Sequence, residues 1–230
     1  MSEQDRELEV AKDQAHDAVA PIDRAYEQGE ITKDEWHARV LEVVEPVYLG
    51  ATTEQMGSGH GGTAEEWEQS RGIVMEAVSN SGSLLDVGCA NGLLMASVAQ
   101  WSSDAGLSVE PYGVEIAPGV ADLARKRYPE WRDRIWTANA DDWVPPMTFD
   151  MVRTAMEYVP RQDRETYVRH LVARAVSPGG RLIIGKNNED KGVPGIAEDL
   201  RSWGWSDVRE VRRPHAHPQV ESTVVWFDIR

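Results

Sequence analysis

The residues from Leu84 to Gly92 form a loop that could hold a nucleotide-like ligand. An apolar run ends in Asp86, and Gly88 and Gly92 follow it before a second apolar run begins. Glycines let the backbone turn sharply and approach a ligand closely, and the free N–H groups of a following helix face that ligand. A dinucleotide fingerprint needs Gly-x-Gly-x-x-Gly, and Ala90 stands at its middle glycine. The sequence of this loop therefore argues against a site that binds the pyrophosphate of a dinucleotide.

Glu115 is the candidate for binding a ribose beside this loop. It lies at the end of the next apolar run, Tyr112–Ile116, and Pro118 follows, a residue suited to the first position of a helix. A carboxylate at a strand end beside a glycine loop can accept hydrogen bonds from both hydroxyls of a ribose. The two segments together indicate a nucleoside-containing ligand.

Strands and helices that alternate along the chain must position these residues. Their alternation predicts an α/β fold with a mainly parallel sheet, helices on both faces, and ligands bound outside the carboxyl ends of the strands. Two final runs, 208–211 and 223–229, predict an antiparallel hairpin at the sheet edge. The expected strands are 84–88, 111–116, 134–138, 149–154 and 181–185, and the expected helices are 92–102, 118–127, 161–176 and a short one near 195–202.

In its order of motifs the chain resembles the class I S-adenosylmethionine-dependent methyltransferase family. Leu84–Gly92 matches the first cofactor motif and Tyr112–Ile116 the second. The later motifs follow in order as Thr137–Ala140, Phe149–Val152 and Ser177–Ile184. The resemblance covers about residues 80–230. It implies a Rossmann-like, doubly wound, mainly parallel seven-stranded sheet with an antiparallel edge strand, with S-adenosyl-L-methionine as cofactor and S-adenosyl-L-homocysteine as product.

The resemblance also implies roles for individual residues in the first two motifs. The main chain near Gly88 and Ala90 would contact the methionine part of the cofactor. Asp86 would orient the loop and hold the ammonium group, and Ile116 would pack on the adenine. Arg71, just before the first strand, is a candidate for pairing with the methionine carboxylate.

The third motif departs from the family pattern. Many relatives carry Gly-Asp-Ala, whose acid accepts a hydrogen bond from the adenine amino group, whereas this chain has Ala138-Asn139-Ala140. Asn139 keeps a carbonyl acceptor, and Asp141 is the alternative. Trp143 either covers the adenine or belongs to the core. The complete cofactor-binding set is Asp86, Gly88, Cys89, Ala90, Gly92, Glu115, Ile116, Asn139, Ala140, Asp141, Thr154 and Arg71.

Glu157, Tyr158 and His60 are the candidates for a general base. Methyl transfer is an in-line displacement, so an enzyme must align the acceptor, exclude water and, for a hydroxyl or protonated amine, remove a proton. The segment Glu157–Pro160 resembles the Glu-His-Val-Pro segment of quinone-biosynthesis O-methyltransferases. Alternatively Glu157 caps a helix and Tyr158 is a buried phenol. His60, in the loop Met56–Gly62, is either a lid group or a solvated residue.

We expect the chain to divide into an N-terminal helical lid, 1–79, and a core, 80–230, that resembles the methyltransferase family. Thr32 with Glu35, and Thr63 with Glu66, predict capping boxes that start two helices, and Pro46 is expected to end the first. The glycine-rich loop between these helices would act as a hinge or lid. The lid and the loop Lys186–Asn188 would form the acceptor pocket, which the aromatic residues Tyr48, Trp67 and Tyr158 could line.

The amino-acid composition limits the classes of molecule that the protein is expected to bind. The net charge of −15 and the pI near 4.8 repel polyanions, so we expect no nucleic-acid partner. The short basic clusters 125–127 and 209–213 are interpreted as solvated surface. The segment after the fourth strand also lacks the Asn/Asp-Pro-Pro-aromatic sequence of DNA amino-methyltransferases. No apolar run approaches a membrane span and no signal peptide is evident, so we expect a cytoplasmic protein without a membrane partner.

The resemblance implies transfer of a methyl group, and the acidic composition favours a small metabolite or natural product as the acceptor, at an oxygen, nitrogen or carbon atom. The single cysteine, Cys89, excludes an intramolecular disulfide, and His215 and His217 lack a third ligand, so no metal is expected. The sequence leaves open whether the chain forms a homodimer. Two other functions also stay open: an enzyme of the same fold that does not methylate, such as a cyclase or decarboxylase, and a non-catalytic binding module.

Overall fold

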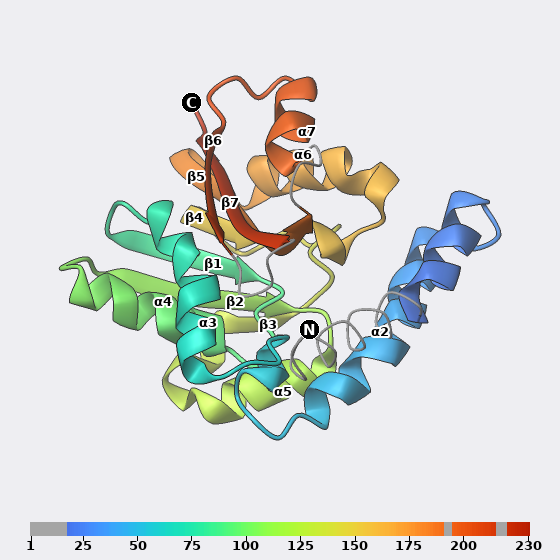
Figure 1. Ribbon diagram of the computed structural model, residues 1–230, viewed down its shortest axis with the longest axis horizontal. Helices are drawn as coiled ribbons and strands as arrows, with labels where there is room; N and C mark the ends of the chain where they lie inside the picture. Colours follow the sequence, from blue (N-terminus) through green and yellow to red (C-terminus); the bar gives the residue numbers. More distant parts are fainter. Residues whose placement is uncertain (1–17, 191–194, 215–219) are drawn as a thin grey trace.

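A computed structural model describes residues 18–190, 195–214 and 220–230 (Figure 1). Its sheet has seven strands in the order β3-β2-β1-β4-β5-β7-β6. The strands are β1 (Gly82–Val87), β2 (Val109–Glu115), β3 (Ile135–Thr137), β4 (Phe149–Thr154), β5 (Val176–Asp190), β6 (Arg209–Pro214) and β7 (Val220–Asp228). This arrangement confirms the predicted doubly wound α/β fold with its seven-stranded sheet.

The pairing of the strands places the loops that could bind a ligand. β1 lies between β2 and β4 and is parallel to both, so the order of the strands reverses there. In open α/β sheets, ligands bind outside the carboxyl ends of the strands at this point of reversal. β7 is antiparallel to both β5 and β6, which confirms the predicted hairpin at the sheet edge.

Helices cover both faces of the sheet. On one face, α4 (Leu93–Asp104) and the 3₁₀ turn Gly72–Glu76 pack over β1 and β4, and α5 (Pro118–Arg127) meets α4 beside β3. On the other face lie α6 (Arg164–Arg174) and α7 (Ile196–Ser202). The described connection from β3 to β4 contains no helix, and the rings of Trp136 and Trp143 pack against the core there. Trp143 is partly buried and packs against the core.

In the part of the chain that the structure describes, two α-helices lie between a helical stretch at 18–27 and the first strand. These are α2 (Lys33–Leu49) and α3 (Ala64–Arg71), and each begins with the predicted capping box. α2 lies against α5, as Figure 1 shows at the lower edge of the molecule. The predicted end at Pro46 is wrong, because α2 continues through the proline to Leu49. A proline removes one backbone donor, and here that loss falls in the exposed last turn, where water can satisfy the freed carbonyl.

Two further boundaries differ from the sequence prediction. β5 extends to Asp190, so Lys186–Asn188 lies in a strand and not in a loop, because β7 is long enough to continue the ladder beyond Lys186. The helix expected at 161–176 is a 3₁₀ turn followed by α6, which ends at Arg174. His215 and His217 lie outside the described residues. None of the helices in the described part combines the length and the apolar character that a membrane crossing requires.

Candidate active site

Two adjoining cavities lie at the carboxyl ends of the strands. The first, called here the α2 cavity, has a volume of about 240 Å³ and is enclosed by α2, the ends of β1 and β2, and the segments after β3 and β4. The second, the arginine cavity, has the same volume and contains Arg71, Asp86 and Arg153. Both are lined by Tyr48, Gly88, Ala90, Glu157 and Tyr158.

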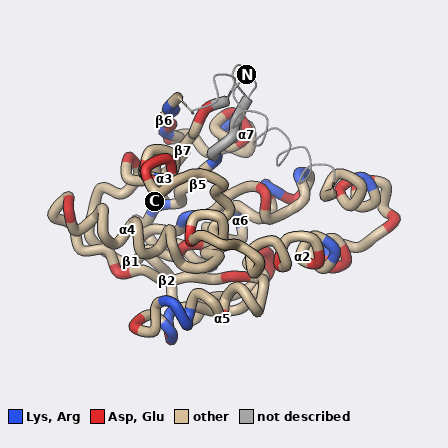
Figure 2. The backbone as a smooth tube through the Cα atoms, turned by 60° about the horizontal axis from the view of Figure 1, so that its bottom comes forward, with Lys and Arg blue, Asp and Glu red and all other residues tan. Residues whose placement is uncertain are grey.

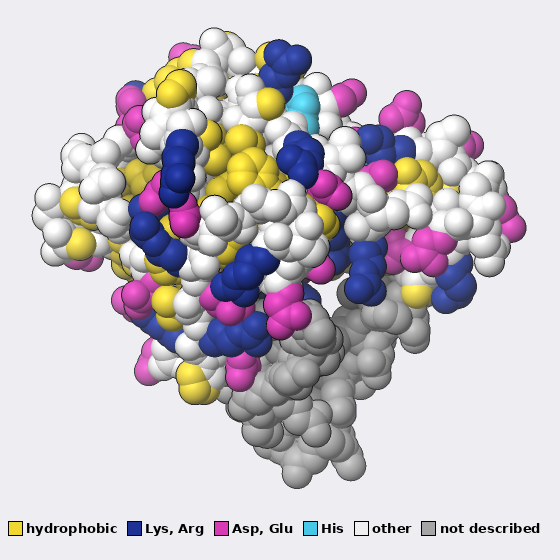
Figure 3. All heavy atoms as spheres, turned by 90° about the horizontal axis from the view of Figure 1, so that it is seen from above, with side chains coloured by type: hydrophobic (Ala, Val, Ile, Leu, Met, Phe, Trp, Pro, Cys, Tyr) yellow, Lys and Arg dark blue, Asp and Glu magenta, His cyan; other side chains and the backbone are white. Residues whose placement is uncertain are grey.

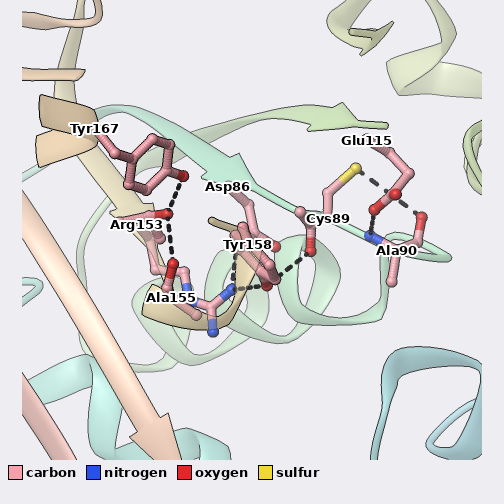
Figure 4. Close-up of polar contacts among 10 residues, drawn as sticks. Asp86, Cys89, Ala90, Glu115, Arg153, Ala155, Tyr158 and Tyr167 are labelled. Carbon is pink, nitrogen blue, oxygen red and sulfur yellow. Dashed lines mark hydrogen bonds and ion pairs between the residues drawn. The ribbon is translucent and has the colours of Figure 1, made fainter. Parts of the chain in front are cut away.

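The loop after β1 forms the floor where the two cavities meet. Gly88 has a φ of 70°, and Ala90 has a φ of 48°, an uncommon value for a residue with a side chain. Glu115 at the end of β2 holds this loop in place, since its Oε2 accepts a hydrogen bond from the Ala90 N–H at 2.9 Å (Figure 4). Its Oε1 accepts from the Ala117 N–H, also at 2.9 Å. The carboxylate thus fixes two main-chain segments.

Glu115 and the two segments that follow β2 and β3 line the α2 cavity as the sequence predicts. Glu115 is only 8% exposed, and burial raises its pKa above the ordinary value. Asn139 accepts a hydrogen bond from the Asp141 N–H at 3.1 Å. Asp141 is itself paired with Lys33 of α2 at 2.5 Å. Ile116 and Ala140 complete this side of the cavity.

α2 supplies the opposite wall, which is mostly apolar. Its inward residues follow helical spacing and include Trp36, Val40, Leu41 and Val44. His37 lies beside this stripe and is 7% exposed, although nothing in the sequence analysis marked it. Placing the residues on a helix would have found it, because His37 is one turn before Leu41.

The arginine cavity contains a buried ion pair. Asp86 and Arg153 are register neighbours on β1 and β4, and Arg153 Nη1 lies 3.1 Å from Asp86 Oδ1. Asp86 is 1% exposed, and burial raises its pKa to about 6 against the opposing effect of Arg153. Its second oxygen, Oδ2, has no hydrogen-bond partner among the described residues. Sequence reasoning missed Arg153, although a charge inside an apolar strand was a signal.

Arg71 enters the same cavity from the end of α3. Its Nη2 donates a hydrogen bond to the Gly59 carbonyl at 3.3 Å, and its guanidinium lies 5.4 Å from the centre of the Trp67 ring. Burial, together with repulsion from Arg153, lowers the pKa of Arg71 to about 10. Arg71 has no salt bridge within the described part of the chain. As far as the described residues show, the cavity therefore holds one guanidinium without an anionic partner.

Tyr158 separates the two cavities. Its ring lies on Gly88, so closely that a β-carbon at Gly88 would overlap it. The hydroxyl is 3.4 Å from the Gly88 carbonyl, to which it donates, and 3.5 Å from Arg153 Nη1 (Figure 4). Burial raises the pKa of Tyr158 above its ordinary value, so the phenol stays neutral near pH 7. The neighbouring Glu157 is exposed and borders both cavities.

Three of the predicted site residues, described next, line neither of the two cavities. His60 is half-buried and packs edge-on against Trp67, with ring centres 5.8 Å apart. Thr154 is buried and its hydroxyl lies 2.6 Å from that of Tyr167. Gly92 caps α4 beneath Tyr128. By contrast Cys89 lines the arginine cavity, where burial raises the pKa of its thiol and keeps it protonated. Tyr48, Trp67 and Tyr158 line that cavity too.

Comparison with known proteins agrees with this arrangement. Residues 84–180 match a family model described as a methyltransferase domain. No curated protein sequence matches the chain significantly.

Several solved structures share the fold. One is the 1,6-didemethyltoxoflavin-N1-methyltransferase of Burkholderia thailandensis, solved with its namesake compound and S-adenosylhomocysteine: it is 16% identical, with a TM-score of 0.61 over 86% of this chain and 91% of that one. Another is the magnesium protoporphyrin IX methyltransferase of Synechocystis PCC 6803 with bound S-adenosylmethionine, at 15% identity and a TM-score of 0.54 over 86% and 95%. The (4+2)-cyclase SpnF also matches, at 14% identity and a TM-score of 0.52 over 70% and 81%. The family match identifies residues 84–180 as a methyltransferase domain, and the solved structures show that the chain shares the fold of S-adenosylmethionine-dependent methyltransferases.

Proposed function

We propose that this chain binds S-adenosylmethionine across the two cavities and transfers its methyl group to a small-molecule acceptor. One observation carries the proposal: the α2 cavity and the arginine cavity adjoin at Gly88, and each holds charged groups that suit one half of this cofactor. The adenosine would occupy the α2 cavity and the methionine part the arginine cavity. The N-terminal residues 1–79 would serve as the lid, with α2 as its inner wall.

The free polar atoms of the arginine cavity match the charges of a methionine group. Asp86 Oδ2 has no hydrogen-bond partner in the described part of the chain and can accept from the ammonium. Arg71 has no anionic partner among the described residues and can pair with the carboxylate in a charge-assisted hydrogen bond. Because Arg153 already neutralises one oxygen of Asp86, the cavity keeps one acceptor and one donor for this zwitterion.

The α2 cavity suits an adenosine. The Glu115 oxygens each accept one backbone hydrogen bond and retain a lone pair for a ribose hydroxyl. The apolar wall of α2 and Ile116 would enclose the adenine. Asn139 and Asp141 remain the two acceptor candidates for its amino group. We favour Asn139 because its amide oxygen accepts one backbone hydrogen bond and retains a lone pair, whereas the Asp141 carboxylate is held by an ion pair with Lys33.

The segment after β4 would align the transfer. Bound here, the cofactor would present an electrophilic methyl group near Tyr158. The acceptor would lie in the arginine cavity beside Tyr48 and Trp67. Glu157 is accessible and can accept a proton from a hydroxyl or ammonium acceptor, whereas Tyr158 stays neutral and can donate a hydrogen bond. His60 would reach the acceptor only if its loop moved.

Calorimetry with S-adenosylhomocysteine, followed by a methyl-transfer assay over a panel of oxygen, nitrogen and carbon acceptors, tests the proposal. We expect saturable 1:1 binding and methylated product from at least one acceptor class. Absence of binding would overturn the proposal and favour a binding module. Binding with acceptor turnover but no consumption of S-adenosylmethionine would replace methyl transfer with a cyclase or decarboxylase type of reaction.

A further inference from the structure

Asn91 connects the loop after β1 to the segment between α2 and α3. Its side chain is buried, with 1% exposed. Nδ2 donates a hydrogen bond to the Glu54 main-chain oxygen at 2.8 Å, and Oδ1 accepts from the Leu93 N–H at 3.1 Å, at the start of α4. Because a carbonyl oxygen only accepts and a main-chain N–H only donates, these two contacts fix the orientation of the amide. One buried amide thus joins two segments that are distant in the sequence.

The segment that Asn91 holds, residues 51–59, forms part of the arginine cavity. It contains the 3₁₀ turn Met56–Ser58. Ser58 and Gly59 line the arginine cavity, whereas residues 51–59 are all described and none of them lines the α2 cavity. The Gly59 carbonyl also accepts the hydrogen bond from Arg71. The 51–59 segment therefore shapes one cavity and holds the guanidinium that is proposed to bind the methionine carboxylate.

The amide of Asn91 is packed as well as hydrogen-bonded. Gly57 is buried against it, and a β-carbon at Gly57 would lie 2.7 Å from Nδ2. The segment is also linked to α5 by an ion pair between Glu54 and Arg127 at 2.9 Å, but these side chains are 54% and 25% exposed. Exposed ion pairs contribute little to stability. The buried contact at Asn91 is therefore the stronger anchor of the two.

We propose that Asn91 is a positioning residue that fixes the 51–59 segment over the arginine cavity, so that this segment and Arg71 are in place for the methionine part of the cofactor. Asn91 itself lines neither cavity, so it acts through the residues that it holds. The inference rests on the proposed function, because that function assigns the arginine cavity to the methionine part. It predicts that loss of the anchor weakens the binding of one half of the ligand only.

Two variants break the anchor from opposite sides. Asn91→Asp keeps an oxygen that accepts from the Leu93 N–H, and a carboxylate is favourable beside the N-terminus of a helix. It replaces the Nδ2 donor with an oxygen that repels the Glu54 carbonyl. Gly57→Ala adds no charge and pushes a β-carbon against the amide. Gly61→Ala is the matched control, because Gly61 is exposed and an added carbon there meets nothing within 4 Å; neither glycine has a positive φ.

Two probes separate the halves of the site. S-adenosylhomocysteine carries the adenosine, the sulfur and the amino-acid group, whereas methylthioadenosine carries the adenosine and the sulfur without the ammonium and carboxylate. Calorimetry gives the dissociation constant of each probe for each variant, with displacement titrations for the weaker ligand. Thermal unfolding checks that the variants are folded. A change in stability alone would weaken both probes alike, so the comparison distinguishes positioning from a purely structural role.

We expect Asn91→Asp and Gly57→Ala to bind S-adenosylhomocysteine about tenfold more weakly, the loss expected from one buried hydrogen bond. Both should bind methylthioadenosine like the wild type, and Gly61→Ala should bind both probes like the wild type. An unchanged affinity for S-adenosylhomocysteine in both variants, or an equal loss for the two probes, would overturn the role of Asn91 and leave the proposed function standing. Absence of S-adenosylhomocysteine binding by the wild type would overturn the proposed function, and this inference with it.

Discussion

Asp86 and Glu115 are both buried acids at strand ends, and their partners give them different tasks. Glu115 accepts two backbone N–H groups and so organises the glycine loop. Asp86 faces Arg153 with one oxygen and leaves the other without a hydrogen-bond partner among the described residues. A buried acceptor without a partner costs free energy unless a ligand supplies a donor. This difference supports the proposed roles, in which Glu115 holds the loop and would bind the ribose and Asp86 would bind the ammonium.

Glu115→Ala should weaken binding of S-adenosylhomocysteine by roughly 2 to 3 kcal/mol, because two ribose hydroxyls lose a charged acceptor in a buried site. Calorimetry measures the change. Glu110→Ala, on the same strand but exposed, is the matched control and should bind like the wild type. An unchanged dissociation constant for Glu115→Ala would remove the ribose assignment.

Protonation of Asp86 should make the binding of S-adenosylhomocysteine depend on pH below neutrality. Its pKa is raised to about 6 in the free protein, so below this value the carboxyl is protonated and no longer offers a charge to the ammonium. Affinity for S-adenosylhomocysteine should therefore fall as pH decreases through about 6, by roughly tenfold between pH 7 and pH 5. Calorimetry across this range checks the result. Binding that stays constant down to pH 5 would show that Asp86 does not hold the ammonium.

At the scale of elements, the β1 loop and the two capped N-terminal helices could be predicted because local residue types determine them. Asp86, Gly88 and Gly92 define a strand, a turn and a helix start within one short segment. The course of α2 beyond Pro46 could not be predicted, because it depends on the solvent exposure of the last turn of that helix. The full length of β5 could not be predicted either, because it depends on pairing with β7, a strand that is distant in the sequence.

The same distinction applies to the site. Motif residues such as Glu115 and Asn139 were found because each follows a recognisable strand. His37 and Arg153 were missed because their contacts, with the Tyr158 carbonyl and with Asp86, join segments that are distant in the sequence. The packing of His60 against Trp67 could not be predicted for a related reason, since flanking glycines say nothing about which neighbour the ring contacts.

The β1 loop gives a prediction at this scale. Gly88→Ala places a β-carbon into the Tyr158 ring and strains a φ of 70°, so S-adenosylhomocysteine binding should be lost. Gly106→Ala is a matched control, because Gly106 has a φ of 76° with nothing within 4 Å of its added carbon. That variant should lose about 1 kcal/mol of unfolding free energy and bind normally. Calorimetry and chemical denaturation make the comparison. Normal binding by Gly88→Ala would contradict the loop's assigned role.

At the scale of the whole molecule, the charges are distributed in a way that suits a small acceptor. The basic run at the end of α5 is visible in Figure 2, but Arg125 pairs with Asp122 and Arg127 with Glu54. Figure 3 shows basic and acidic side chains interspersed on the face seen from above. With a net charge of −15, the chain is expected to repel polyanions. The two cavities of about 240 Å³ each fit small ligands.

Ligand binding should stabilise the entire fold, because a ligand that binds only the native state shifts the unfolding equilibrium. At S-adenosylhomocysteine concentrations about a hundredfold above the dissociation constant, the stabilisation should be about 2.7 kcal/mol. For a chain of this size that raises the unfolding midpoint by roughly 5 to 11 °C. Differential scanning calorimetry measures the shift, and Gly88→Ala should show none. A wild-type midpoint that does not respond to the ligand would argue against a native-state site.

A crystal structure of the protein with S-adenosylhomocysteine tests the central claim most directly, because it locates both halves of the ligand at once. We predict the adenosine in the α2 cavity with its ribose hydroxyls on Glu115, and the homocysteine in the arginine cavity with its ammonium at Asp86 and its carboxylate at Arg71. The sulfur should lie beside Tyr158, between the two cavities. A ligand found elsewhere, or one that occupies a single cavity without contacting Glu115, would contradict the account.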